Sequence, residues 1–95
     1  MENNEIKKII ITLTGADKVG IVAKITDTLA KCNVNIEDIR QSIMQDHFIM
    51  MMLCNIKKSE LSFKEIKEQL TKTADELEME IWVQKKDIFD KMHTI

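Results

Sequence analysis

Apolar side chains follow two different periods along the chain, and each change of period marks an expected element. Apart from Lys7 and Lys8, residues 6–14 are apolar or β-branched, which favours a strand. After a loop over residues 15–20, apolar side chains recur at helical spacing, and this predicts an amphipathic helix over residues 18–32. Asp17 is placed to cap the first turn of that helix. Asn33 follows the helix at a position where left-handed backbone geometry is common.

The middle of the chain predicts two strands joined by a polar turn. Residues 34–44 alternate between apolar and polar, but the phase changes near Glu37 and Asp38, which indicates a strand with a bulge or a bend there. Residues 45–47 are polar and typical of a turn. Residues 48–54 are consecutively apolar, a pattern that predicts a strand buried on both faces.

The last third of the chain predicts a helix, a strand and a short tail. Ser62 and Glu65 have the spacing of a capping box at the start of a second amphipathic helix, over residues 63–77. Residues 79–84 then alternate as a fourth strand. The tail, residues 87–95, carries several large apolar side chains, so we expect a helical turn that packs back onto the domain.

The order of elements, strand-helix-strand-strand-helix-strand, defines the expected fold. We predict a single domain over residues 1–95, with its core in residues 6–86. The fold class is α+β: a ferredoxin-like βαββαβ sandwich with a four-stranded antiparallel sheet and two helices on one face. The first and third strands are expected in the centre of the sheet, and the second and fourth at its edges.

The sheet face without helices is the first indication of a function. By their phase along the strands, Ile10, Trp82 and one set of methionines including Met51 fall on this face. Exposed apolar patches larger than about 400 Å² usually mark interaction surfaces. We therefore expect a homo-oligomer interface here. The alternative is that the tail folds over the face within one chain.

Composition narrows the class of protein. The chain has 95 residues, 44% hydrophobic and 32% charged, with a formal net charge of −2, which favours a globular domain over a nucleic-acid-binding one. No apolar run is long enough for a membrane helix, and residues 1–5 are polar, unlike a signal peptide, so a cytoplasmic protein is expected. Cys32 and Cys54 lie in apolar surroundings and are predicted to be buried, reduced thiols.

The candidate catalytic and metal-binding features are weak. His47 and His93 have no neighbouring ligand or base at a useful spacing. Adjacent methionines in 50–52 point to opposite faces of a strand, so they do not form a copper site. The segment from Gly15 to Gly20 lacks the Lys and Ser/Thr of a phosphate-binding loop. We therefore expect no enzyme activity, no metal and no cofactor.

Two segments resemble ACT domains. Residues 14–22 carry an acidic residue and a glycine in the loop after the first strand, and residues 33–36 form a polar-apolar start to the second strand. Residues 35–41, 48–51 and 88–92 also resemble the short stand-alone ACT proteins of bacteria and archaea. The chain is similar in this respect to the ACT modules of the glycine-cleavage repressor.

The resemblance implies a ligand site. In ACT domains an amino acid binds between the loop and the start of the second strand of a neighbouring subunit. The resemblance carries this role onto six residues: Asp17, Val19, Gly20, Ile21, Asn35 and Asp38. Amides at the helix start can hold a carboxylate, Gly20 admits it closely, Asn35 offers an amide and Asp38 can pair with an ammonium group. Val19 departs from the pattern, because many ACT domains have proline there.

The resulting hypothesis is a small regulatory module. It would sense an amino acid or related small carboxylate at a subunit interface and act on a partner enzyme or regulator. The alternative is a ligand-free oligomerisation or interaction protein. In that case Asp17 is only a helix cap, Gly20 only a packing contact and Asn35 only a turn residue. The residues alone leave both open.

Overall fold

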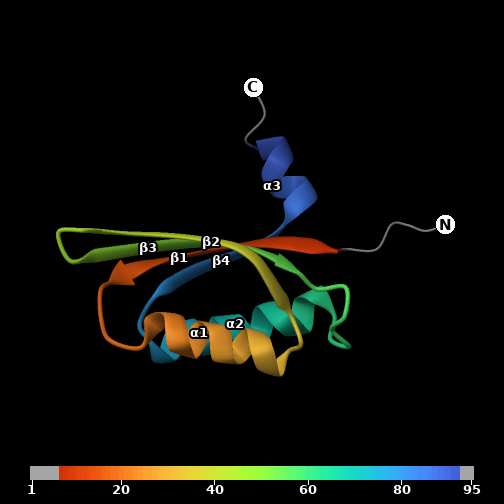
Figure 1. The fold of residues 1–95 in the computed structure, drawn as a ribbon, viewed down its shortest axis with the longest axis horizontal. Helices are drawn as coiled ribbons and strands as arrows, with labels where there is room; N and C mark the ends of the chain where they lie inside the picture. The colour runs from red at the N-terminus through yellow and green to blue at the C-terminus, as the bar shows by residue number, and fades with distance from the viewer. Residues whose placement is uncertain (1–6, 93–95) are drawn as a thin grey trace.

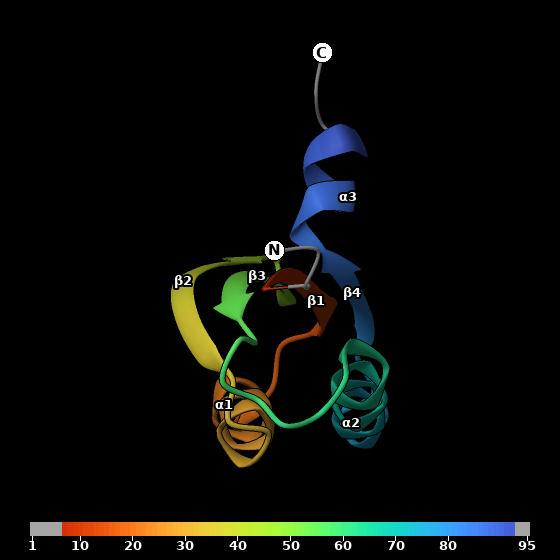
Figure 2. The ribbon, with the colours of Figure 1, turned by 90° about the vertical axis from the view of Figure 1, so that its right-hand side faces the viewer.

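The computed structural model describes residues 7–92, which form one antiparallel sheet with two long helices on one face and a short helix on the other (Figure 1). The elements are β1 (Lys8–Ala16), α1 (Ile21–Lys31), β2 (Asn35–Met44), β3 (His47–Asn55), α2 (Phe63–Glu76), β4 (Glu80–Lys85) and α3 (Lys86–Met92). Seen from the end, α1 and α2 lie side by side against the sheet (Figure 2). The predicted ferredoxin-like α+β sandwich is confirmed.

The strand order is β2-β3-β1-β4, so the predicted central and edge strands are confirmed. β1 pairs with β3 along its whole length, from Lys8 opposite Asn55 to Ala16 opposite His47. The predicted bulge in β2 is also present, as a register shift between Ile36 and Asp38. This register places the β1–α1 loop and the β2–β3 turn at one end of the sheet, and the start of β2 at the other.

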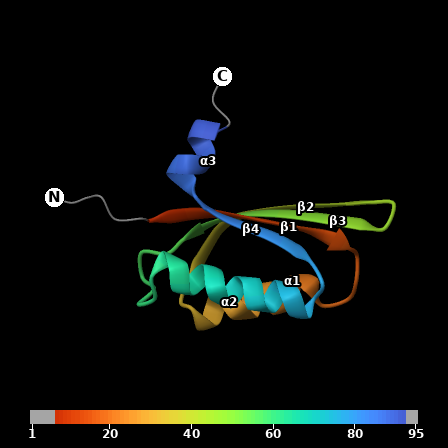
Figure 3. The ribbon, with the colours of Figure 1, turned by 180° about the vertical axis from the view of Figure 1, so that it is seen from behind.

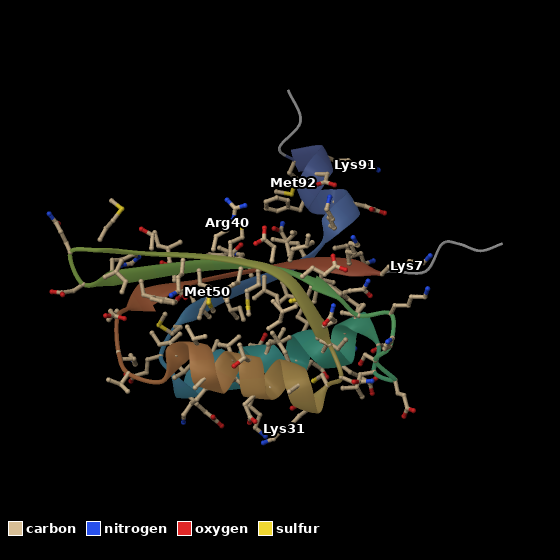
Figure 4. The ribbon with its side chains drawn as sticks, viewed as in Figure 1. Lys7, Lys31, Arg40, Met50, Lys91 and Met92 are labelled. Carbon is tan, nitrogen blue, oxygen red and sulfur yellow. The ribbon has the colours of Figure 1, made fainter. Side chains whose placement is uncertain are left out.

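The core lies between the sheet and the two long helices. β1 and β3 send alternate side chains into it, and each helix contributes one apolar stripe. The side chains in it that are at most 1% exposed are Ile9, Ile11, Leu13, Ile25, Leu29, Met50, Met52, Cys54, Ile66, Leu70 and Ala74. Figure 4 shows Met50 between the sheet and the helices, whereas Arg40 points away from the opposite side of the sheet. Helix spacing and strand alternation therefore predicted the core face correctly.

Two predicted helix boundaries are confirmed by their local geometry. Ser62 caps α2, since its hydroxyl accepts from the Glu65 amide at 3.1 Å while a Glu65 carboxylate oxygen accepts from the Ser62 amide at 2.8 Å. Asn33 adopts the expected left-handed geometry, with φ of 59°, just beyond α1.

The start of α1 was predicted wrongly. The helix begins at Ile21, not at residue 18, and its N-cap is Gly20, with φ of 92° and no side-chain cap. Asp17 is therefore not the cap: its backbone amide donates to the Asp46 carbonyl at 2.8 Å, which keeps it with the sheet. β1 also extends further than expected, because Gly15 and Ala16 still pair with β3. The predicted first residue of this strand, residue 6, lies outside the described residues.

β3 is buried on one face only, and the prediction of burial on both faces is wrong for the single chain. Phe48, Met50 and Met52 are at most 3% exposed, whereas Ile49 and Met51 between them are each 39% exposed. The reason is that α1 and α2 both cover the same side of the sheet. The other side, called here the open face, is covered by neither long helix (Figure 3).

Two expectations for the open face need correction. Ile10 is on this face but only 7% exposed, since Leu53 and Gln84 flank it across the sheet and α3 leaves the sheet close by. The tail forms the expected helix and returns one contact to the sheet, in which the Gln84 side-chain amide donates to the Met92 sulfur at 3.5 Å, but it does not cover the face. Instead α3 stands up from it (Figures 1 and 3), none of its residues is buried, and Trp82 stays 50% exposed. The part of the predicted tail after residue 92 lies outside the described residues.

Candidate functional site

The β1–α1 loop, residues 17–20, is held in place from two sides. The Asp17 amide bonds to the Asp46 carbonyl of the β2–β3 turn at 2.8 Å. The Lys18 ammonium donates to the Leu77 carbonyl at the end of α2, at 2.5 Å, and lies 3.7 Å from a Glu78 carboxylate oxygen. The loop thus has a defined shape although it is at the surface. Sequence reasoning missed the role of Lys18, because its partner is 59 residues away.

The N-terminus of α1 presents main-chain donors without a competing side chain. No side chain caps the helix, and its first turn contains no acidic residue. The first amides of any α-helix lack partners within the helix, and the helix dipole makes them attractive to anions. Outside residues 19–21 no atom lies within 4 Å of where a Gly20 side chain would begin, and Val19 is fully exposed. The arrangement can therefore accept a carboxylate from solvent.

Asn35 lies at the opposite end of the sheet, at the first residue of β2. It lines a pocket of about 400 Å³ with Asn33, Val34, Asn55, Lys57 and Lys58. Two hydrogen bonds fix the pocket wall. The side-chain amide of Asn33 donates to the Lys58 backbone carbonyl at 2.9 Å, and the backbone amide of Lys57 donates to the side-chain oxygen of Asn55 at 2.8 Å. This pocket has polar amide groups and two lysines, which suits a small polar ligand.

Asp38 lies on the open face rather than in the Asn35 pocket. Its carboxylate accepts from the Ile39 amide at 2.9 Å and lies 3.4 Å from the Arg40 guanidinium. With Ile10, Arg40 and two residues of β3 it lines a shallow hollow of about 310 Å³. An ammonium group would have to share this carboxylate with Arg40.

The single chain does not bring the six predicted residues together. Asp17, Val19, Gly20 and Ile21 are at one end of the sheet, and Asn35 is at the other, about 25–30 Å away for a nine-residue strand. The sequence-based expectation that a neighbouring subunit must complete the site is consistent with this geometry.

Glu37 has the clearest electrostatic partners at the β2 end of the sheet. Its carboxylate lies 3.1 Å from the Lys8 ammonium and accepts from the Asn55 side-chain amide at 3.2 Å. These hydrogen bonds, first that from Lys8 and then that from Asn55, lower the pKa of Glu37. Sequence reasoning used Glu37 only as a marker of the bulge. The bulge is what turns it toward β1 and β3, and that depends on strand pairing.

The two cysteines should be inert in the folded protein. Both are buried and unpaired. Burial raises the pKa of both thiols, that of Cys54 to about 12, where the charge of Glu37 adds to the effect of burial. At pH about 8 we expect a thiol-specific reagent to label neither in native protein and both after unfolding. Rapid labelling of native protein, or a disulfide found by mass spectrometry, would contradict this assignment.

Residues 7–92 offer neither a metal-binding cluster nor a membrane-spanning helix. In this part of the chain no group of three or more His, Cys, Asp or Glu side chains is placed to hold a metal ion. Over the same residues no helix is long and apolar enough to cross a membrane.

Comparison with known proteins identifies the family. The ACT domain model matches residues 7–84. A UPF0237 protein of Listeria innocua is 42% identical over 86 residues, which are 90% of this chain and 97% of that protein. A UPF0237 protein of the archaeon Methanococcus maripaludis is 45% identical over 89 residues, which are 94% of this chain and 99% of that protein.

Solved structures agree with this assignment. An ACT domain protein from Streptococcus pneumoniae has a TM-score of 0.76 and 29% identity, over 94% of this chain and 97% of that one. A candidate glycine cleavage system transcriptional repressor matches with a TM-score of 0.73 at 19% identity, over 82% of this chain and 44% of its own. At that identity the likeness shows the shared fold alone. The family match and the relatives of nearly equal length show that the chain belongs to the ACT-domain family and is similar to its short members in bacteria and archaea.

Proposed function

We propose that the protein binds an amino acid or a related small carboxylate between two copies of the chain and thereby regulates a partner protein. The observation that carries the proposal is the N-terminus of α1. It has no side-chain cap, an open Gly20 and a loop held by Asp46 and Leu77. Membership of a family of regulatory ligand-binding modules supports the same conclusion.

Each end of the ligand has a matching group. The amides of residues 21–23 would hold the carboxylate, with the helix dipole favouring the negative charge. Asp17 has an exposed side chain beside them and can pair with the ammonium group. Asn35 of a neighbouring copy would add an amide. Asp38 would contribute less, because Arg40 already neutralises its charge.

The position of β2 explains how a second copy completes the site. β2 is an edge strand, so its outer edge has no partner within residues 7–92. Antiparallel pairing of two such edges brings Asn35 of one copy near Met44 of the other. Met44 precedes the turn whose Asp46 carbonyl is bonded to Asp17. An edge contact of this kind therefore joins the two halves of the site.

Melting curves recorded with a panel of amino acids and small carboxylates test the proposal. A ligand that binds only the folded protein raises the melting temperature, and the shift grows with the logarithm of its concentration above the dissociation constant. With that ligand, Asn35→Ala should weaken binding at least tenfold, since a hydrogen bond to a charged group contributes about 1.5–3 kcal/mol. Gln41→Ala is the matched control, because Gln41 is an exposed amide in the middle of the same strand.

Two outcomes would count against the site. If no member of the panel shifts the melting curve at millimolar concentration, the protein acts as a ligand-free interaction module. If a ligand is found and Asn35→Ala binds it as well as the parent does, Asn35 is not part of the site.

A further inference from the structure

We propose that the open face of the sheet is a contact surface for a second copy of this chain. The two sheets would pack face to face, with α3 of each copy closing the gap at one end. The main ligand groups lie elsewhere, on the β1–α1 loop and at Asn35 of β2, and Asp38 alone belongs to both surfaces.

The open face has an apolar centre and a polar margin. Cross-strand partners point to the same side of a sheet, so the register defines the residues of the face. Its apolar centre is formed by Ile49, Met51, Leu53 and Trp82, with Ile10 beneath them. Its charged margin includes Lys8, Glu37, Asp38, Arg40 and Glu80. An apolar centre that contains a tryptophan, surrounded by polar groups, is the usual anatomy of a protein interface.

The size of the face suits a dimer. Four strands spaced about 4.8 Å apart, with central strands about 30 Å long, give a flat area of roughly 550 Å². The surface of protruding side chains exceeds this flat area, and α3 adds further surface. A stable interface buries about 800 Å² on each partner. The open face can therefore supply an interface of ordinary size, and a smaller ligand would leave most of it exposed.

The charges of the face allow contact with an identical copy. Lys8 lies 3.1 Å from Glu37, and Asp38 lies 3.4 Å from Arg40, so these four charges are paired within each chain. Two identical faces can approach without strong repulsion, because only Glu80 lacks an opposite charge in this set. A strongly basic or acidic partner would meet no excess of opposite charge on this face.

The length of α3 matches the gap between two packed sheets. Seven residues of α-helix are about 10 Å long, and sheets that pack face to face lie about 10 Å apart. α3 stands up from its own sheet, with Met92 on the same side as Arg40 (Figure 4). Its tip would therefore reach the sheet of the second copy.

The exposure of α3 also supports a second copy of the chain as the partner of the open face. Ile88 is 48% exposed and Met92 64% exposed, and helices this short are marginal without a packing surface. A second sheet would provide that surface. A two-fold axis that crosses the strands sets the two α3 helices at opposite ends of the assembly.

The fluorescence of Trp82 tests this contact directly, because it is the only tryptophan in the chain. We expect light scattering to show association as concentration rises from nanomolar to high micromolar. Trp82 emission should shift to shorter wavelength over the same range as its ring becomes buried. Trp82→Glu should weaken association at least about a hundredfold, since losing a buried interface tryptophan typically weakens binding by about tenfold or more and the residue occurs once in each copy.

Two further variants separate this contact from misfolding. Ile88→Asp alters only α3, which contributes nothing to the core, and should also weaken association while the melting temperature of the monomer stays unchanged. Thr71→Glu, on the exposed side of α2, should leave association unchanged.

Three results would overturn the proposal. The first is a protein that stays monomeric at every concentration. The second is a change in mass with no change in Trp82 emission, which would assign assembly to another surface such as the β2 edge. The third is an assembly whose mass at high concentration is the same in the parent as in both Trp82→Glu and Ile88→Asp, because pairing through the β2 edge alone would survive these changes. The ligand experiments do not depend on this contact, so a negative result for the open face does not contradict the proposed ligand site.

Discussion

Met52→Asp is expected to abolish folding, whereas the same replacement at the neighbouring Met51 leaves a folded chain. Met52 is 1% exposed and lies in the core between the sheet and the helices, while Met51 is 39% exposed on the open face. The two residues are adjacent in sequence and identical in chemistry. Only the alternation of β3 distinguishes them.

The size of the effect follows from the two environments. Burying an ionised carboxylate without a partner costs several kcal/mol, which is comparable to the whole stability of a domain, about 5–15 kcal/mol. At Met51 the new carboxylate is solvated and faces Arg40, its cross-strand partner, so the loss should be about 1 kcal/mol or less. The Met51 variant should instead lose self-association through the open face.

Chemical denaturation followed by circular dichroism measures this difference. The Met52 variant should show no cooperative transition, and the Met51 variant should unfold cooperatively at a midpoint close to that of the parent. Equal stability of the two variants would show that the assigned faces of β3 are wrong.

Gly20→Val is expected to reduce ligand binding at least tenfold while costing the fold only about 1–2 kcal/mol. With φ of 92°, Gly20 adopts a left-handed conformation that β-branched residues avoid. Outside residues 19–21 no atom lies within 4 Å of the new Cβ, so the change strains the backbone without a clash at that atom. The strain and the added side chain both act where the amides of α1 would receive the carboxylate.

Gly20→Asn separates the two causes. Asparagine tolerates left-handed geometry, so this variant should melt close to the parent, but its side chain still occupies the approach to the amides. Titration calorimetry with the ligand found by the melting panel should show weak binding to both variants. If the asparagine variant binds like the parent, the side chain does not block the ligand, and only the conformation of Gly20 matters.

Most of the fold could be predicted because local patterns and the fold agree. Helical spacing placed the buried faces of α1 and α2, and the Ser62–Glu65 pair placed the start of α2. The change of phase at Glu37 revealed the bulge in β2. Each of these signals depends on side chains within a few positions of one another, which is why one sequence was sufficient.

The errors came from features that depend on distant contacts. A run of apolar residues in β3 cannot show that one face of the sheet has no helix. Asp17 looked like a cap, because nothing local indicates that its amide bonds to Asp46 across the sheet end. Ile10 appeared exposed, because the direction in which α3 leaves the sheet is not encoded in the alternation of β1.

For the candidate site, the sequence suggested residues but could not show where the fold places them. The resemblance selected Gly20 and Asn35, and the structure shows that they lie at opposite ends of the sheet. Lys18 and Glu37 were missed, because their partners, Leu77 and Lys8, are brought close only by the finished fold.

The two ties on the β1–α1 loop have a consequence for the order in which the chain folds. Asp17 and Asp46 are 29 residues apart (46 − 17), and Lys18 and Leu77 are 59 apart. Contacts across such separations form late, because closing long loops is entropically unfavourable until the rest of the chain supports them. A partly synthesised chain that lacks the end of α2 cannot form the contact between Lys18 and Leu77, so its β1–α1 loop does not reach its final conformation. An effector bound there would therefore recognise only completed molecules, and would stabilise those molecules against unfolding without rescuing unfinished ones.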